Sequence, residues 1–252
     1  MTIAFCFLVY NHIIRYDIWN DFFKNINYEK YIVYIHSKNN ILNTSMDENI
    51  YTFNYKIVNN IINTISKDHI SIVRATIQLF KETYMYNDKI THYIFLSQSC
   101  IPLYNFNKIY EITIKFNNSV ISSINKNKKE RYYQLHNDIK KHIKYIDFVK
   151  QQPNMILIKN DIIDLLNYNF TLYFNNMQCP DEHYFINVLL NILKKKIIKH
   201  QINFCNNDIN KTQAIEFNLV DKNLINKIRN HGFLFMRKLN KRSIIDYNYL
   251  FI

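Results

Sequence analysis

Short apolar segments alternate along this chain with segments whose apolar residues recur at helical spacing. Residues 2–10, 31–36 and 92–97 are apolar enough, and short enough, to be strands buried on both faces of a sheet. Residues 12–26 and 66–84 lie between them, and each has one apolar face at 3.6-residue spacing. This alternation favours a single α/β domain spanning residues 1–252, with a mainly parallel sheet that binds ligands at the carboxyl ends of its strands.

Weaker patterns predict the remaining elements. We expect further strands at 50–55, 119–124, 155–158 and 199–204, and further helices at 105–114, 160–166, 181–193 and 224–230. Gly232 is placed to stop the last of these helices, and residues 125–144 are typical of a basic surface loop or short helix.

The rarity of glycine excludes several functions. Gly occurs once, so the chain has no G-x-G-x-x-G dinucleotide turn, no Walker A loop and no kinase glycine-rich loop. No Asp-x-Asp or H-E-x-x-H occurs, and His136 and His142 are poorly spaced for one helical metal face, so we expect no metal and no cofactor. Four cysteines without a C-x-x-C favour a reducing compartment over disulfides or a zinc knuckle.

The chain is basic, with 32 Lys and Arg against 20 Asp and Glu and a formal charge of +12. Such a charge suits nucleic acid, an anionic membrane or phosphate-bearing substrates. The lysines are spread out, however, and the bias toward Ile, Asn, Lys and Tyr resembles an AT-rich viral or bacterial coding sequence. We therefore expect solvated surface lysines and no nucleic-acid partner, although a basic nucleic-acid-binding protein stays open as an alternative.

No apolar run approaches the ~18 residues of a transmembrane helix. Residues 1–10 are apolar but lack the basic start of a signal peptide. These patterns predict no membrane anchor and a cytoplasmic location.

Polar clusters directly follow the three most apolar strands. They are Tyr10-Asn11-His12, His36-Ser37-Lys38 and the segment 97–102, which contains Gln98 and Ser99. In a doubly wound sheet these clusters converge on one crevice. Each of them alone is equally typical of an ordinary turn at the end of a strand.

Two further clusters carry charge. Pro180 is suited to the first position of a helix, which puts Asp181 and Glu182 in the first turn, where the helix dipole favours ionised carboxylates. An ionised carboxylate there can act as a general base, or it can simply complement the dipole. Arg237 and Lys238 suit a diphosphate, or form an exposed basic pair.

In this order, the clusters resemble the core-2/I-branching β-1,6-N-acetylglucosaminyltransferase family (glycosyltransferase family 14), which also contains peptide O-xylosyltransferases. The resemblance spans nearly the whole chain, and SQSCIPL and PDEHYF are its most specific parts. The matching stretches are IAFCFLVYNH (3–12), YIVYIHSK (31–38), SIVRATIQLF (71–80), HYIFLSQSCIPLYNF (92–106), KERYY (129–133), PNMILIKNDIIDLL (153–166), CPDEHYF (179–185) and KIRNHGFLFMRKL (227–239).

The resemblance implies a GT-A-like fold and an inverting, metal-independent transfer of a sugar, N-acetylglucosamine or xylose, from a UDP-sugar to a hydroxyl of a glycan or glycoprotein. It implies that Glu182 is the general base and that Arg237 and Lys238 stabilise the departing UDP. The other residues that it implies are, for the donor, Tyr10, Asn11, His36, Gln98, Ser99 and Lys211, and, for the acceptor, Arg131 and Asp181.

Two of the departures of the sequence from the family motivate an alternative. HSK (36–38) stands where vertebrate members tend to have H-V-D, and QQPNM (151–155) replaces a segment expected to contact the sugars. The alternative is therefore a catalytically inactive member that binds a glycan or a nucleotide sugar.

Overall fold

A six-stranded sheet forms the centre of the protein. The computed structural model describes residues 1–38, 51–66, 69–124, 129–206 and 215–251. The strand order is β3-β2-β1-β4-β7-β6, and β7 alone runs against the other five. The strands of this sheet are β1 (Thr2–Val9), β2 (Tyr31–Ser37), β3 (Tyr55–Ile57), β4 (Ile90–Ser97), β6 (Val120–Ile124) and β7 (Lys150–Ile158). The predicted α/β fold with a mainly parallel sheet is confirmed.

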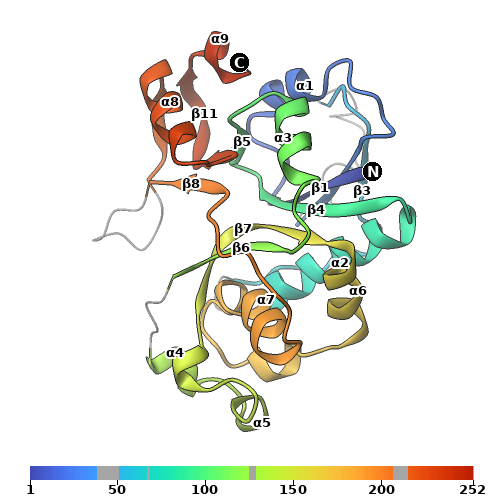
Figure 1. The fold of residues 1–252 in the computed structure, drawn as a ribbon, viewed down its shortest axis with the longest axis vertical. Coiled ribbons are helices and arrows are strands. Elements are labelled where there is room, and N and C mark those ends of the chain that lie inside the picture. Colours follow the sequence, from blue (N-terminus) through green and yellow to red (C-terminus); the bar gives the residue numbers. More distant parts are fainter. Residues whose placement is uncertain (39–50, 67–68, 125–128, 207–214, 252) are drawn as a thin grey trace.

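Helices cover both faces of the sheet (Figure 1). The larger ones are α1 (Tyr16–Phe23), α2 (Ser71–Tyr86), α3 (Phe106–Thr113), α6 (Lys159–Asn167) and α8 (Lys222–Asn230), and the short ones are α4 (Lys129–Tyr133), α5 (Asn137–Lys140), α7 (Tyr184–Asn187) and α9 (Tyr247–Leu250). Along β1, Ala4 and Cys6 face the core shared with α2 and α6, whereas Phe5 and Phe7 face the core shared with α1 and α3. This burial on both faces is why the strand lacks polar alternation.

Two small sheets lie beside the central one. The first has the order β5-β10-β8 and the second pairs β11 with β9. Their strands are β5 (Ile101–Pro102), β8 (Asn203–Cys205), β9 (Phe217–Val220), β10 (Phe235–Arg237) and β11 (Leu239–Ile245). A third apolar cluster, which includes Ile18 of α1 and Met236 of β10, joins them to the rest (Figure 1). The last residues of the chain therefore pack beside the first helix.

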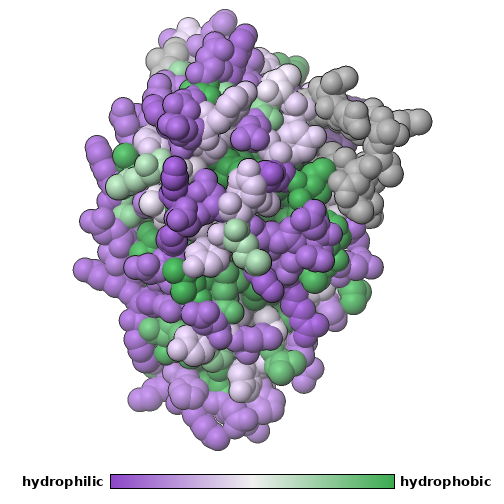
Figure 2. Space-filling model, turned by 90° about the vertical axis from the view of Figure 1, so that its right-hand side faces the viewer, coloured by the Kyte–Doolittle hydropathy of each residue, from purple (hydrophilic) through white to green (hydrophobic). Residues whose placement is uncertain are grey.

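Polar side chains cover most of the face drawn in Figure 2, and apolar side chains form small patches between them. Among the described residues no helix is long and apolar enough to cross a membrane.

Two predicted elements need correction. Residues 181–193 are not one helix: Pro180–Glu182 form a 3-10 turn (η4), α7 follows, and Val188–Ile192 form a π turn (η5). The interruption lies at His183, whose φ of −132° separates η4 from α7, and the side-chain amide of Asn187 bonds to the carbonyls of Val149 and His183. Asp181 and Glu182 therefore do not sit at the start of a long helix, and the dipole argument for them is wrong.

The weak strand expected at 50–55 is the second correction, because β3 begins only at Tyr55 and residue 50 lies outside the described residues. Gly232, in contrast, follows α8 with a φ of +79° and its N–H bonds to the Arg229 carbonyl, which confirms its predicted role as the helix stop.

Candidate active site

The carboxyl ends of β1 and β4 lie side by side at the topological switch point, where the strand order of the sheet reverses. The chain passes from β1 to β2 on one side of the sheet, and from β4 to β6 and β7 on the other side. The connections that leave the ends of β1 and β4 therefore run in opposite directions, which opens a crevice between them. The Tyr10 N–H donates to Gln98 Oε1 at 2.7 Å, and the Ile14 N–H donates to the Gln98 carbonyl at 2.9 Å. These bonds join the polar clusters that follow the two strands.

The end of β2 joins the same place. The Ser37 hydroxyl donates to the Asn11 carbonyl at 3.0 Å, and the Lys38 ammonium lies 5.1 Å from the centre of the Tyr10 ring. The expected convergence of the three clusters is therefore confirmed.

A cavity of about 500 Å³ opens at this junction. Its walls are made by Tyr10, Asn11, His12, Ile14, Gln98, Asn240, Lys241 and Arg242. The sequence patterns did not predict Lys241 and Arg242 as site residues. Both end the basic run R-K-L-N-K-R (237–242), which could have indicated them. The cavity thus has two cations and no carboxylate in its lining.

A buried arginine binds the segment of the chain that carries Lys241 and Arg242. Arg15 is 8% exposed, and its guanidinium donates to the Ser243 carbonyl at 3.0 Å and to both oxygens of Asp17. It also bonds to the hydroxyl of Tyr247. Arg15 therefore connects the start of α1 to the irregular segment of β11 that carries Lys241 and Arg242.

The predicted basic pair lies at the end of β4. Arg237 ends β10 next to β8, and its Nε is buried without a hydrogen-bond partner among the described residues. The N–H of Leu239, the residue after Lys238, donates to the Ser99 carbonyl at 3.1 Å. Arg237 and Lys238 are thus brought to the same crevice as Ser99, although neither lines the cavity itself.

Glu182 reaches this edge of the sheet because β7 is antiparallel. The start of an antiparallel strand lies beside the end of its neighbour, so Lys150 lies at the edge where β4 ends. Two strand spacings of ~4.8 Å separate β1 from β7, and Lys150 lies beyond the end of β4, because Phe95 of β4 pairs with Met155. The Lys150 ammonium and the Arg131 guanidinium bind Glu182 Oε2 at 2.8 and 2.7 Å.

These two cations determine the charge of Glu182. Burial alone raises the pKa of Glu182, but hydrogen bonds and charge attraction from Lys150 and Arg131 outweigh it and hold the pKa below its ordinary value. The side chain is 32% exposed, and both ion pairs use Oε2. Glu182 is therefore an ionised carboxylate at neutral pH that is still reached by solvent.

Its two neighbours in sequence have shifted pKa values as well. Burial, followed by the charge of Glu182, raises the pKa of Asp181 to about 6, and Asp181 Oδ1 is buried without a hydrogen-bond partner among the described residues. Burial lowers the pKa of His183 to about 4, so its ring is neutral and donates from Nδ1 to the Val149 carbonyl. The ring stacks on Phe148 at 4.7 Å, which makes His183 a support for the Glu182 turn.

Three predicted residues lie elsewhere or change partner. His36 is fully buried, does not line the cavity, and accepts a hydrogen bond from the Ile62 N–H. Lys211 lies outside the described residues. Arg131, expected beside the acceptor, is bound to Glu182. Among the described residues, no three or more His, Cys, Asp or Glu side chains are grouped to hold a metal ion.

Comparison with known proteins gives a family and several distant likenesses. The model of the Core-2/I-Branching enzyme family matches residues 3–229. Glycosyltransferase BC10 of Oryza sativa subsp. japonica is 26% identical over 131 residues, which are 52% of this chain and 32% of that protein. This chain therefore spans about a third of the length of that relative.

Among solved structures, the apo form of the bifunctional glycosyltransferase WbbM matches 94% of this chain and 45% of its own, with a TM-score of 0.46 and 8% identity. A 4-diphosphocytidyl-2C-methyl-D-erythritol synthase from Anaerococcus prevotii matches 78% of this chain and 85% of its own, with a TM-score of 0.37 and 13% identity. The family match extends from β1 to the end of α8 and so includes the three converging clusters and the Glu182 turn. The chain belongs to the core-2/I-branching enzyme family.

Proposed function

We propose that residues 1–252 act as one inverting, metal-independent glycosyltransferase domain, which moves a sugar from a UDP-sugar to a hydroxyl of a glycan or glycoprotein. The observation that carries this proposal is a basic cavity, free of carboxylates, at the crevice where β1 and β4 end, on the same sheet edge as Glu182. Family membership supports the reaction class, and N-acetylglucosamine or xylose is the proposed sugar.

In this proposal the donor lies across the ends of β1 and β4, against Tyr10, Asn11, Gln98 and Ser99. The acceptor oxygen attacks the anomeric carbon as the bond from that carbon to the diphosphate breaks, so negative charge builds on the departing UDP. Fixed cations beside Ser99, namely Arg237 and Lys238, stabilise that charge without reorganisation.

The proton of the acceptor hydroxyl passes to Glu182. Because Lys150 and Arg131 both bind Oε2, Oε1 is the oxygen proposed to accept the proton. The two cations keep the carboxylate ionised and fix its orientation, and Asp181 lies next to it on the proposed acceptor side.

The same ion pairs favour a second candidate function. A carboxylate bound to two cations is a weak base, and a family member whose base is weakened in this way can retain sugar or nucleotide binding after losing transfer. The alternative is therefore a binding module without turnover.

Transfer assays in EDTA with a panel of UDP-sugars and hydroxyl acceptors distinguish the two. We expect turnover by the wild type, none by Glu182→Gln, and nearly unchanged UDP affinity of that variant by calorimetry. Glu130→Gln, an exposed change on the neighbouring helix α4, is the matched control. Equal loss of UDP affinity and turnover in Glu182→Gln would refute its role as the base, and absence of turnover with every donor would favour the binding module.

Lys238 has a separate test. Lys238→Ala removes a cation that the proposal places against the diphosphate, so UDP binding should weaken. Unchanged affinity would remove Lys238 from the donor site.

A further inference from the structure

We propose that Lys241 and Arg242 form an anion subsite that binds the phosphate groups of the donor nucleotide, in addition to the basic pair at 237–238. This inference rests on the proposed function, since it names residues that hold its donor. It starts from the lining of the cavity, where these two side chains are the only Lys or Arg and no Asp or Glu is present.

These two cations have no counter-ion among the described residues. Three other basic side chains near the cavity or the Glu182 turn are paired with carboxylates: Arg15 with Asp17, and Arg131 and Lys150 with Glu182. Neither Lys241 nor Arg242 pairs with a carboxylate in the described part of the chain. An anion that enters the cavity therefore meets positive charge that no protein group has to release first.

The segment of β11 that carries them is held in place before any ligand binds. The Asn240 N–H donates to the Ser243 hydroxyl at 2.9 Å, and the Arg242 N–H donates to Asn240 Oδ1 at 2.8 Å. The Ser243 hydroxyl donates in turn to the Phe217 carbonyl at 2.7 Å, and Arg15 binds the Ser243 carbonyl. Since the backbone is already ordered, binding loses little conformational entropy there.

Tyr10 and Gln98 give the rest of the cavity lining an aromatic and amide character. Tyr10 is 53% exposed and presents an aromatic ring, and the side-chain amide of Gln98 lies beside it. A lining that combines an aromatic ring and an amide with two cations matches a ligand with a planar base at one end and phosphates at the other. The volume of about 500 Å³ is within the range of small-molecule sites.

Calorimetric titration in EDTA with UDP, uridine and pyrophosphate tests the subsite. We expect Lys241→Ala and Arg242→Ala each to weaken UDP and pyrophosphate binding roughly tenfold, because each removes charge-assisted bonds to phosphate. Uridine binding should be unchanged. Arg242→Lys keeps the charge but loses the planar fork, so its UDP affinity should lie between those of the wild type and Arg242→Ala.

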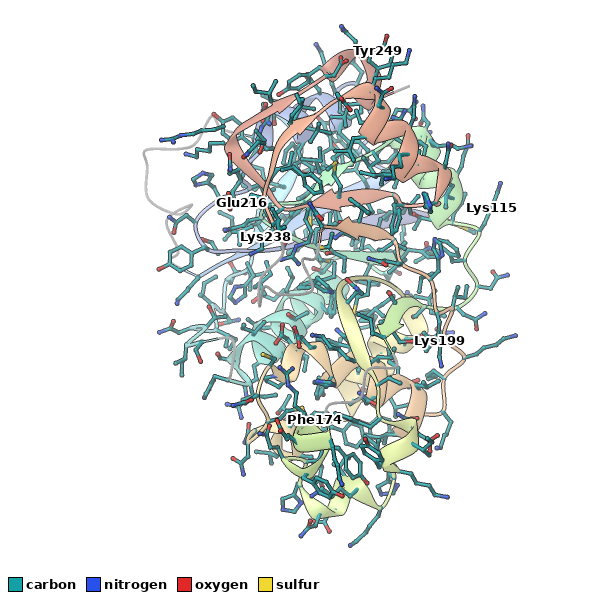
Figure 3. The ribbon with its side chains drawn as sticks, turned by 90° about the vertical axis from the view of Figure 1, so that its left-hand side faces the viewer. Lys115, Phe174, Lys199, Glu216, Lys238 and Tyr249 are labelled. Atoms are coloured by element: carbon teal, nitrogen blue, oxygen red, sulfur yellow. The ribbon has the colours of Figure 1, made fainter. Side chains whose placement is uncertain are left out.

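Lys115→Ala is the matched control. It removes one exposed cation that lies on the side of the molecule away from Lys238 (Figure 3), so it changes the net charge equally without touching the cavity. We expect its UDP affinity to equal that of the wild type.

The outcomes separate the subsite from the proposed function. If the wild type binds UDP and both alanine variants bind it equally well, the subsite is refuted and the UDP donor stands. If Lys115→Ala weakens binding as much as they do, the effect is long-range charge and the subsite is again refuted. If the wild type binds neither UDP nor pyrophosphate, the UDP donor is refuted and the subsite with it.

Discussion

Replacing Arg15 with Met tests whether the buried guanidinium holds the two ends of the chain together. Met has a similar length but cannot donate, so the Ser243 carbonyl loses its charged donor in a buried position. Such a bond contributes about 1.5–3 kcal/mol. The pair with Asp17 adds at most about 1 kcal/mol, because the Asp17 side chain is 45% exposed and screened by water. We expect the free energy of unfolding to fall by about 2–4 kcal/mol.

Urea denaturation followed by circular dichroism measures this change. UDP titration of the same variant should show weaker binding, because the segment of β11 that carries Lys241 and Arg242 loses its hydrogen bond to Arg15. Arg74→Met is the control: the exposed Arg74 side chain donates a 3.2 Å hydrogen bond to Asn175 Oδ1, so we expect a loss below about 1 kcal/mol. A stability loss for Arg15→Met no larger than that of the control would refute the reasoning.

Three further predictions concern the core and the Glu182 turn. Trp19 is fully buried and donates from its indole to the Cys100 carbonyl, so Trp19→Ala should lower the free energy of unfolding by about 3–5 kcal/mol in urea; a loss below about 1 kcal/mol would contradict its place in the core. Lys150→Met removes a cation that lowers the pKa of Glu182, so that pKa should rise and the acid limb of the kcat/KM profile should move to higher pH; an unmoved limb would mean that Glu182 is not the titrating base. The pKa of Asp181 is raised from 3.8 to about 6, so its ionisation destabilises the folded state as pH rises through that window. The free energy of unfolding of Asp181→Asn, relative to that of the wild type, should therefore rise by up to about 3 kcal/mol between pH 4 and pH 7. A difference that does not change with pH would refute this linkage.

The central sheet could be predicted because its signal is local. Burial on both faces requires a continuous apolar run, and residues 2–10 carry one, so β1 was readable without any partner. The meeting of Tyr10 and Gln98 followed from a general rule, that the carboxyl ends of parallel strands share one edge.

The rest depends on pairings that sequence does not state. Nothing local to residues 150–158 shows that β7 runs antiparallel, yet that direction is what brings Lys150 to Glu182. The helix expected at 181–193 is interrupted at His183, whose ring bonds to the carbonyl of Val149, 34 residues away. Lys241 lines the cavity because Arg15 binds the nearby Ser243 carbonyl of β11. No pattern in the sequence around Arg15 or around Ser243 predicts that contact.

The fastening between Arg15 and Ser243 also fixes when the cavity forms during synthesis. Arg15 and Ser243, which connect its two walls, are 228 residues apart in the chain. At ~5–20 residues per second, a ribosome makes the second wall roughly 10 to 45 s after the first. The first strands must therefore wait, already folded or shielded, for β11 to emerge and dock. If the cavity binds the proposed nucleotide donor, that binding stabilises the docking of β11 against Arg15.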